Sequence, residues 1–326
     1  MMYKLRPDVE PGRILDLELS ELESLRDKVF SRILSYIAKK PKDDVLVDTH
    51  ATFRKGLEGL FAGFTPQEVV DFRPNMCVNL MADVDEVKAR LVESDFPLKD
   101  ITLRDIMVWR EEELLGSELM ADLVKNCKYY AVPRYFDAES LEKLIFDRKT
   151  PKCYLSFPIT GELAPEVKKQ IDDFRNAFRT LGNLVTFDPL SGTAEPVLVS
   201  KMHKARFENP KAKTISVSRL GKTIELSIEE LEAIEPYVDG QIKSFDLRMV
   251  AQSDATIAFF PEIGGKSYAA PGVVIELAYA RHKVRDRFLI WTGNDPVTAM
   301  LKPFTKKFDS LHEAVDFFKS GRYRRR

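Results

Sequence analysis

The chain has few of the residues that would place it in several common classes of protein. Among its 326 residues only three are cysteine and four are histidine. The cysteines, Cys77, Cys127 and Cys153, lie far apart without paired spacing, and the histidines show no metal-ligand spacing. We therefore expect no disulfide framework, no structural zinc and no cofactor. Such cysteine usage is typical of the reducing cytoplasm, where we expect the protein to act.

Long apolar runs and an excess of one charge are also missing. No run approaches the roughly 20 apolar residues that a membrane helix needs, and we expect no signal segment at the N-terminus. Lysine and arginine together number 50, aspartate and glutamate 51, and the formal net charge is −1. We therefore expect neither a membrane nor a nucleic acid as a partner.

A chain of this length fits two domains, because single hydrophobic cores rarely grow beyond about 250–300 residues. Strand-like and helix-like segments alternate, which predicts an α/β protein with two domains, each a mainly parallel sheet flanked by helices. The polar segment 147–152 contains a proline and separates two such runs. We therefore predict an N-terminal domain over 1–149 and a C-terminal domain over 150–326, the latter with an insertion at about 191–236.

The apolar periodicity predicts the individual elements of both domains. Predicted helices lie at 15–38, 83–91, 103–125, 138–146, 165–181 and 311–318, and around Asp246 and Glu276. Predicted strands lie at 45–48, 76–80, 129–132, 153–156, 184–187, 255–260 and 288–291, with a hairpin over 214–226. The amphipathic helix over 15–38 also favours self-association as a dimer or a larger oligomer.

Two acidic residues flank the predicted strand 255–260, Asp246 on the helix before it and Glu276 on the helix after it. Open α/β sheets bind ligands at the carboxyl ends of their strands. There a carboxylate flanked by apolar Ile275 and Leu277 could act as a nucleophile or base. The alternative is a glutamate that only solvates the surface of its helix.

Cleavage of a glycosidic bond needs a carboxylate at the anomeric carbon and a proton donor for the leaving group. Asp246 and Glu276 could supply both roles, because two neighbouring carboxylates push their pKa values apart. Asp254 begins a strand and is expected to be a cap or turn acid. The loop 157–161 could hold a phosphate or sugar hydroxyls through its backbone N–H groups.

The second domain resembles the nucleoside 2-deoxyribosyltransferase-like family, which includes nucleoside 5′-monophosphate N-glycosidases. The matching segments are Tyr154-Leu-Ser-Phe-Pro-Ile-Thr-Gly161, Asp246-Leu-Arg-Met-Val-Ala-Gln-Ser-Asp254 and Ala270-Pro-Gly-Val-Val-Ile-Glu-Leu-Ala-Tyr-Ala280. The resemblance implies a Rossmann-like or flavodoxin-like fold. It also implies cleavage of the N-glycosidic bond of a nucleoside or nucleotide, or deoxyribosyl transfer, in nucleotide metabolism or salvage.

Site residues follow from the same resemblance. It implies that Glu276 attacks the anomeric carbon, that Asp246 assists at the sugar and that Tyr154 lines the pocket. The substrate-binding residues it implies are Phe157, Pro158, Ile159, Thr160, Gly161, Ala270, Pro271, Gly272 and Asn294. Relatives carry aspartate or serine where Ala270 stands, and often glycine where Phe157 stands. These departures leave open the base, the sugar, the need for a 5′-phosphate, and hydrolysis versus transfer.

The first domain resembles archaeal-type adenylate-kinase-like P-loop proteins, on segments 45–52, 73–80 and 85–90. It contains no G-x-x-x-x-G-K-[ST] loop, which holds the phosphates in such proteins. We therefore expect a truncated or degenerate kinase fold without phosphoryl transfer, in which Asp48 and His50 are structural remnants. The alternatives to a glycosidase are a non-catalytic nucleotide sensor and a fragment of a bifunctional kinase-glycosidase.

Overall fold

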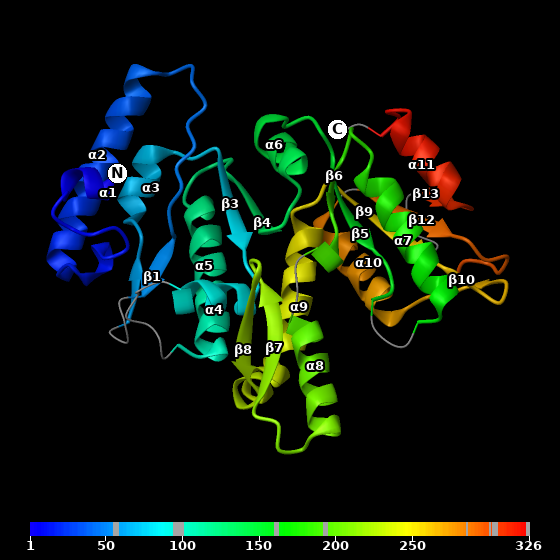
Figure 1. Ribbon diagram of the computed structural model, residues 1–326. Helices are drawn as coiled ribbons and strands as arrows, with labels where there is room; N and C mark the ends of the chain where they lie inside the picture. The colour runs from blue at the N-terminus through cyan, green and yellow to red at the C-terminus, as the bar shows by residue number, and fades with distance from the viewer. Residues whose placement is uncertain are drawn as a thin grey trace. The chain divides into compact units, whose positions relative to one another are not determined.

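The computed structural model describes residues 1–54, 59–93, 101–159, 163–191, 195–284, 286–299, 301 and 306–323. The chain is α/β, as predicted, and folds into two compact units, each made of two stretches of sequence (Figure 1). The first unit comprises Met1–Tyr130 and Ala194–Pro236. The second comprises Ala131–Thr193 and Tyr237–Arg326.

The first unit combines helices with short strands in pairs. Its helical segments are α1 (Met2–Leu5), η1 (Ile14–Asp16), α2 (Leu19–Lys39), α3 (Pro66–Phe72), α4 (Val84–Glu93), α5 (Leu103–Asp122) and α8 (Glu195–Glu208). Its strand pairs are β1 (Thr52–Arg54) with β2 (Leu60–Ala62), β7 (Thr214–Arg219) with β8 (Lys222–Ser227), and β3 (Met76–Met81) with β4 (Lys128–Pro133), which begins in this unit. Capping boxes at Thr65 and Thr102 start α3 and α5, because each threonine accepts from the N3 backbone N–H.

Two predictions for the N-terminal half are wrong. Residues 45–48 form no strand, and Leu46 is 67% exposed, whereas a buried parallel strand is covered on both faces. The strands of the first unit that the structure describes form no mainly parallel sheet, since they pair two by two and two of the pairs are antiparallel. The predicted strands at 76–80 and 129–132, the long N-terminal helix and the hairpin are confirmed.

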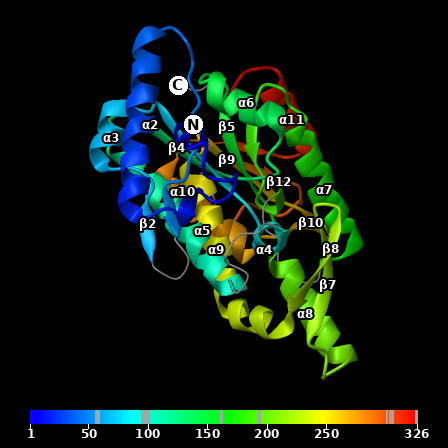
Figure 2. The ribbon, with the colours of Figure 1, turned by 60° about the vertical axis from the view of Figure 1, so that its left-hand side comes forward.

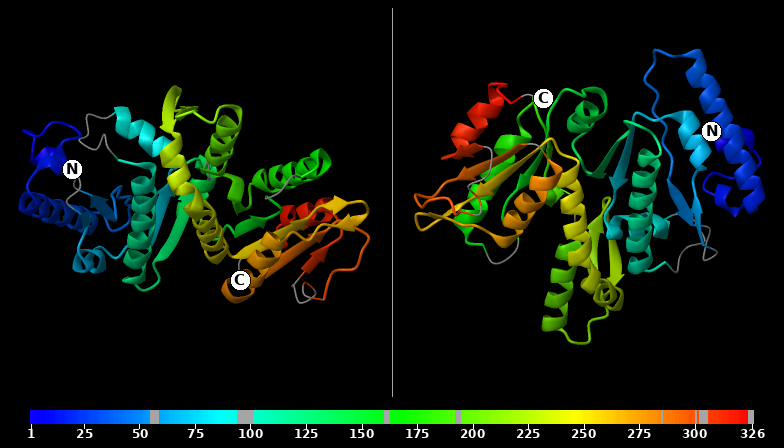
Figure 3. Two further views of the ribbon diagram at one scale, coloured as in Figure 1. Left: turned by 90° about the horizontal axis from the view of Figure 1, so that it is seen from below. Right: turned by 180° about the vertical axis from the view of Figure 1, so that it is seen from behind.

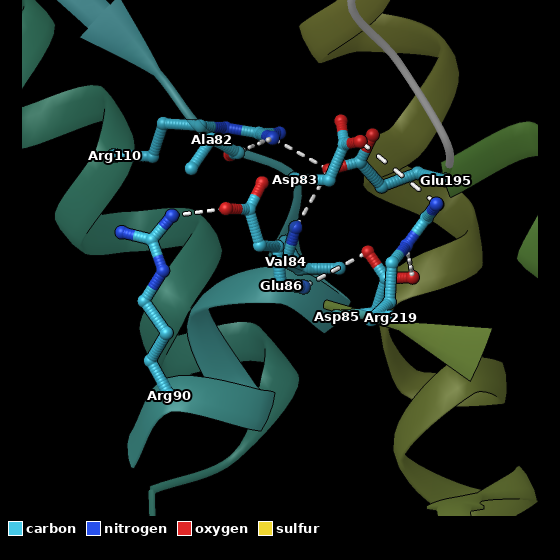
Figure 4. A network of polar contacts seen from close by, with 9 residues as sticks. All are labelled: Ala82, Asp83, Val84, Asp85, Glu86, Arg90, Arg110, Glu195 and Arg219. Carbon is cyan, nitrogen blue, oxygen red and sulfur yellow. Dashed lines mark hydrogen bonds and ion pairs between the residues drawn. The ribbon is translucent and has the colours of Figure 1, made fainter. Parts of the chain in front are cut away.

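Buried ionic contacts hold the segment that begins at α8 within the first unit (Figure 4). Arg219 at the end of β7 binds Asp85 of α4, whose side chain is fully buried. Glu195, 2% exposed, accepts hydrogen bonds from the Val84 N–H at 3.3 Å and from Arg110 at 2.5 Å. Partners more than 80 residues apart are joined here, so sequence proximity gave no sign of them.

These contacts correct the predicted division of the chain. The boundary at 149/150 lies instead after Tyr130, and the segment predicted as an insertion in the second domain belongs to the first unit. The physical reason is charge complementarity, because the guanidinium of Arg219 compensates a carboxylate that would otherwise be buried alone. The C-terminal unit is therefore discontinuous in sequence.

The second unit is built on a five-stranded parallel sheet in the order β13-β12-β9-β5-β6. Its strands are β5 (Lys152–Ser156), β6 (Val185–Phe187), β9 (Ala255–Phe260), β12 (Asp286–Trp291) and β13 (Lys306–Phe308). Counted along the chain, this is the order 2-1-3-4-5 of flavodoxin-like sheets. Such sheets bind ligands where the order reverses, which here is at the carboxyl ends of β5 and β9.

Helices cover both faces of this sheet (Figures 2 and 3). They are α6 (Ala138–Phe146), α7 (Pro165–Arg179), α10 (Pro271–Lys283), α11 (Leu311–Lys319) and the second part of α9 (Ile228–Ala251), with the short pair β10 (Glu262–Ile263) and β11 (Lys266–Ser267) and the turn η2 (Pro189–Ser191) beside them. On one face α7 and α11 form an aromatic core, in which Phe174 stacks on Phe259 at 4.8 Å between ring centroids. On the other face α10 buries Val273 and Leu277.

Candidate active site

Strand β5 brings two hydroxyl groups to one face of the sheet. Successive side chains of a strand point to opposite faces, so Tyr154 and Ser156 share one face, while Cys153 and Leu155 enter the aromatic core on the other. Tyr154 and Ser156 are both fully buried. Their hydroxyls lie at the carboxyl end of β5, where the strand order reverses.

Glu276 on α10 meets both hydroxyls. The Tyr154 hydroxyl donates to its Oε1 at 2.9 Å, and the Ser156 hydroxyl donates to its Oε2. Both carboxylate oxygens are therefore oriented, one by each donor. Ser156 is not among the predicted site residues. Its spacing of two from Tyr154 on a strand is the signal that places both side chains on one face.

Burial governs the protonation of this site. It raises the pKa of Glu276 to about 7, while the hydrogen bonds from Ser156 and Tyr154 oppose the rise. It also raises the pKa of Tyr154 well above its ordinary value, with the charges of Glu276 and Asp246 adding to the effect. The phenol is therefore a hydrogen-bond donor at neutral pH.

Asp246 joins the two other predicted catalytic residues at the same place. It lies on α9, half-buried, one turn and a half before the helix ends. Burial, and then the charge of Glu276, raise its pKa to about 8. Tyr154 and Glu276 are in contact, and the charges of Glu276 and Asp246 both act on Tyr154, so the three groups lie within electrostatic range of one another. Two carboxyls with pKa values near neutrality can divide acid and nucleophile roles between them.

A further acid, Asp188, lies just beyond the end of β6 and has no counterpart among the predicted residues. Its side chain is 3% exposed and accepts from Arg175 Nε at 2.9 Å and from the Leu190 N–H at 3.0 Å. Its charge contributes to raising the pKa of Tyr154. An aspartate directly after a buried strand was the signal that could have found it.

The loop after β5 contributes less than expected. Phe157 packs into the aromatic core, edge-on to Phe174 at 5.9 Å, so its ring faces away from Glu276. Pro158 is buried and Ile159 exposed, while Thr160 and Gly161 lie outside the described residues. The alternation of strand side chains explains the position of Phe157, because it follows Ser156 by one residue.

The substrate-binding residues predicted near α10 do not share one environment. Ala270, the N-cap of α10, is 7% exposed and belongs to the core beneath the helix. Pro271 and Gly272 form the exposed first turn. Asn294 is exposed, and its backbone N–H donates to Gly265 O at 2.9 Å.

Asp254 has a structural role, but the contacts that show it join two strands and are not those of the predicted cap or turn acid. Its Oδ2 accepts from the Lys152 N–H at 2.9 Å, and its own N–H donates to Lys152 O at 2.7 Å. These bonds fasten the start of β9 to the start of β5. They thereby set the register in which Tyr154 and Ser156 reach Glu276.

Two further kinds of feature are absent from the described residues. Among them, no group of three or more His, Cys, Asp or Glu side chains could hold a metal ion. No helix that the structure describes is long and apolar enough to cross a membrane. No protein-family model matches the chain, and a search of curated proteins finds no match either.

Proposed function

We propose that the second unit cleaves the N-glycosidic bond of a nucleoside or nucleotide, with water or a second base accepting the sugar. The observation that carries the proposal is the Glu276 carboxylate, held by Tyr154 and Ser156 beside a second carboxyl group, Asp246. This pair lies at the edge of the sheet where flavodoxin-like folds bind ligands.

In the first step a Glu276 oxygen attacks the anomeric carbon. A bond forms between that oxygen and the sugar, the bond from the sugar to the base nitrogen breaks, and its electron pair leaves with the base. Asp246, which retains its proton up to about pH 8, donates it to the departing base. In the second step water or another base attacks the anomeric carbon, gives its proton to the Asp246 carboxylate, and displaces Glu276 as a carboxylate.

Tyr154 and Ser156 serve as positioning residues for the nucleophile. Their hydrogen bonds favour the ionised form of Glu276, because both donate to carboxylate oxygens. Without them the pKa of Glu276 would rise further and less of it would be ionised at neutral pH. They also fix which face of the carboxylate is free for attack.

The substrate class follows from the resemblance of the segments around Tyr154, Asp246 and Glu276 to the nucleoside 2-deoxyribosyltransferase-like family. The methyl group of Ala270 offers no hydrogen bond to a base or phosphate, so selectivity must come from other groups. We further propose that the protein acts in the cytoplasm as a dimer or larger oligomer.

The test is release of free base from a panel of nucleosides, deoxynucleosides and their 5′-monophosphates. Glu276→Gln is compared with wild type and with Glu166→Gln, a control at an exposed glutamate on α7. We expect release by wild type and by the control, and a loss on the order of 10³-fold or more in Glu276→Gln. Equal release by all three proteins, or release by none, would refute the proposal.

A second candidate function is nucleotide binding without turnover, which a cavity in the first unit favours. The cavity has a volume of about 290 Å³ and is lined mainly by apolar side chains, together with the polar residues Asp48, Thr49, His50, Asn79, Glu113 and Ser117. Asn79 donates to Ser117 Oγ at 3.1 Å, and Glu113 Oε1 lies 3.6 Å from His50 Nδ1. Saturable thermal stabilisation by the same compounds without product would support this function.

A further inference from the structure

Two of the three cysteines meet in the first unit, although 50 positions separate them. The Sγ atoms of Cys77 and Cys127 lie 3.8 Å apart, and both thiols are free. Cys77 is the second residue of β3, and Cys127 directly precedes β4, the strand paired with β3. The sequence spacing alone gave no sign of this pair.

The backbone on both sides of the pair is fixed by hydrogen bonds. The Cys127 N–H donates to Val124 O at 3.0 Å, closing the turn that leaves α5, and Asn126 takes the left-handed conformation with φ 68°. The next residue, Lys128, donates its N–H to Asn75 O at 3.0 Å. The two sulfurs are therefore held as neighbours by the fold, at 3.8 Å, against about 2.05 Å in a disulfide.

The two thiols are not equivalent. Cys77 is 7% exposed, whereas Cys127 is half-buried and can be reached from solvent. The hydrogen bond between them lowers the pKa of Cys127, and a bond from the Cys77 backbone N–H acts in the same direction. The same thiol contact, together with burial, raises the pKa of Cys77. A reachable thiol with a lowered pKa beside a buried thiol is the arrangement of an attacking and a resolving cysteine.

We propose that Cys77 and Cys127 form a modification site, at which a peroxide oxidises the pair reversibly to a disulfide. The Cys127 thiolate attacks one peroxide oxygen and becomes a sulfenic acid, while the other oxygen leaves as hydroxide. The Cys77 sulfur then attacks the sulfenic sulfur, its proton joins the departing hydroxyl, and water leaves as the disulfide forms. An external thiol reverses the reaction by exchange.

The site lies in the wall of the 290 Å³ cavity, which Cys77 lines together with Asn79 and Ser117. Asn79 lies two residues beyond Cys77 on the same face of β3. Joining the sulfurs draws the start of β3 towards the turn before β4, so oxidation acts on the wall of this cavity. Both cysteines belong to the first unit, and their oxidation is independent of the chemistry proposed for Glu276.

The third cysteine supplies an internal reference. Cys153 lies on β5 in the core of the second unit, is fully buried, and burial raises its pKa. It should therefore react with neither peroxide nor alkylating reagents in the folded protein. Any reagent that modifies Cys153 reports unfolding rather than the reactivity of the pair.

The experiment treats the reduced full-length chain with hydrogen peroxide, alkylates the remaining thiols, and identifies the peptides by mass spectrometry. We expect a peptide pair joined through Cys77 and Cys127, which disappears on treatment with dithiothreitol, and Cys153 still reduced. Cys153→Ser should form the same cross-link. In Cys77→Ser, a dimedone probe should label Cys127 at least about tenfold more than Cys153.

Three outcomes would overturn the proposal. They are absence of the cross-linked peptide in wild type, cross-links that involve Cys153 equally, and labelling of Cys127 no greater than that of Cys153. Because the wild-type measurement needs no substitution, it decides the question even if a serine variant fails to fold. Circular dichroism before and after oxidation checks that the fold is kept.

Discussion

The Tyr154 hydroxyl lies 2.9 Å from Oε1 of Glu276, joining a buried strand to a helix that starts more than 100 residues later. The phenol keeps its proton, since burial and nearby carboxylates raise its pKa. It therefore donates to the carboxylate in both states that the proposed reaction needs, before attack and after release. The reactivity of Glu276 should depend on this donor.

Removing the phenol hydroxyl should move the titration of Glu276. In Tyr154→Phe one of the two hydrogen bonds that lower the pKa of Glu276 is lost, so the acid limb of the pH–rate profile should shift to higher pH. We expect base release near pH 7 to fall about tenfold to a hundredfold. The control is Tyr279→Phe, which changes a half-buried tyrosine on α10, the helix that carries Glu276. An unmoved acid limb would contradict the role given to Tyr154.

Asp246→Asn should remove the proposed proton donor. Base release should fall on the order of 10²–10⁴-fold for substrates whose base is a poor leaving group, and much less where the base leaves readily. The alkaline limb of the pH–rate profile should also disappear. Asp239→Asn, at an exposed position of the same helix, is the matched control. A uniform loss for all leaving groups would speak against acid catalysis by Asp246.

Wild-type activity should follow a narrow bell-shaped pH profile. Glu276 must be ionised, which requires a pH above about 7, and Asp246 must be protonated, which requires a pH below about 8. The maximum should therefore lie between these values, which belong to the coupled pair as a whole. The measurement is kcat/KM from pH 5 to pH 10. A plateau that extends to high pH would mean that no acid with this pKa is needed.

Ionisation of Glu276 should also destabilise the folded protein at alkaline pH. The pKa of Glu276 is raised from 4.5 to about 7 on folding, so its contribution to stability is fully present below about pH 4.5 and is lost as the pH rises through 7. The difference in unfolding free energy between Glu276→Gln and wild type should therefore change with pH. Between pH 4.5 and pH 8 it should shift by roughly 1–3 kcal/mol in favour of Glu276→Gln. Denaturant titrations at pH 4.5 and pH 8 test this. The same difference at both values would contradict it.

The first unit should depend on the ion pair between Arg219 and Asp85. Burial raises the pKa of Asp85 and Arg219 lowers it, so Arg219→Leu leaves a fully buried carboxyl without that partner. We expect a loss of about 3–5 kcal/mol in the free energy of unfolding of this unit. Adding Asp85→Asn should restore a large part of it. Additive losses in the double variant would show that the pair is not coupled.

The elements whose pattern is local could be predicted from sequence. The runs at 153–156 and 255–260 are mostly apolar and, as expected for parallel strands covered on both faces, buried along their whole length. Asp254 is predicted to be a cap or turn acid, but its carboxylate accepts from the Lys152 N–H, 102 positions away, which no local pattern indicates. Asp246 and Glu276 could be grouped because their helices flank the strand 255–260, and Tyr154 joined them only through the family resemblance.

What could not be predicted depends on partners far away in the chain. Residues 45–48 are apolar enough for a strand, but a strand needs neighbours, and sequence does not supply them. Phe157 is different, because the resemblance predicts that it binds substrate whereas the local alternation along β5 already directs it into the core. The assignment of 194–236 and the meeting of Cys77 with Cys127 both rest on contacts that no local pattern reveals.

The discontinuity of the second unit bears on how the protein emerges from the ribosome. Strands β5 and β6 are made before the chain leaves this unit at Thr193, whereas β9, the central neighbour of β5, follows only after it returns at Tyr237. At a translation rate of about 5–20 residues per second, the apolar faces of β5 and β6 stay uncovered for several seconds until β9 has been synthesised. During that interval the exposed apolar surface of the nascent chain can aggregate or be bound by chaperones.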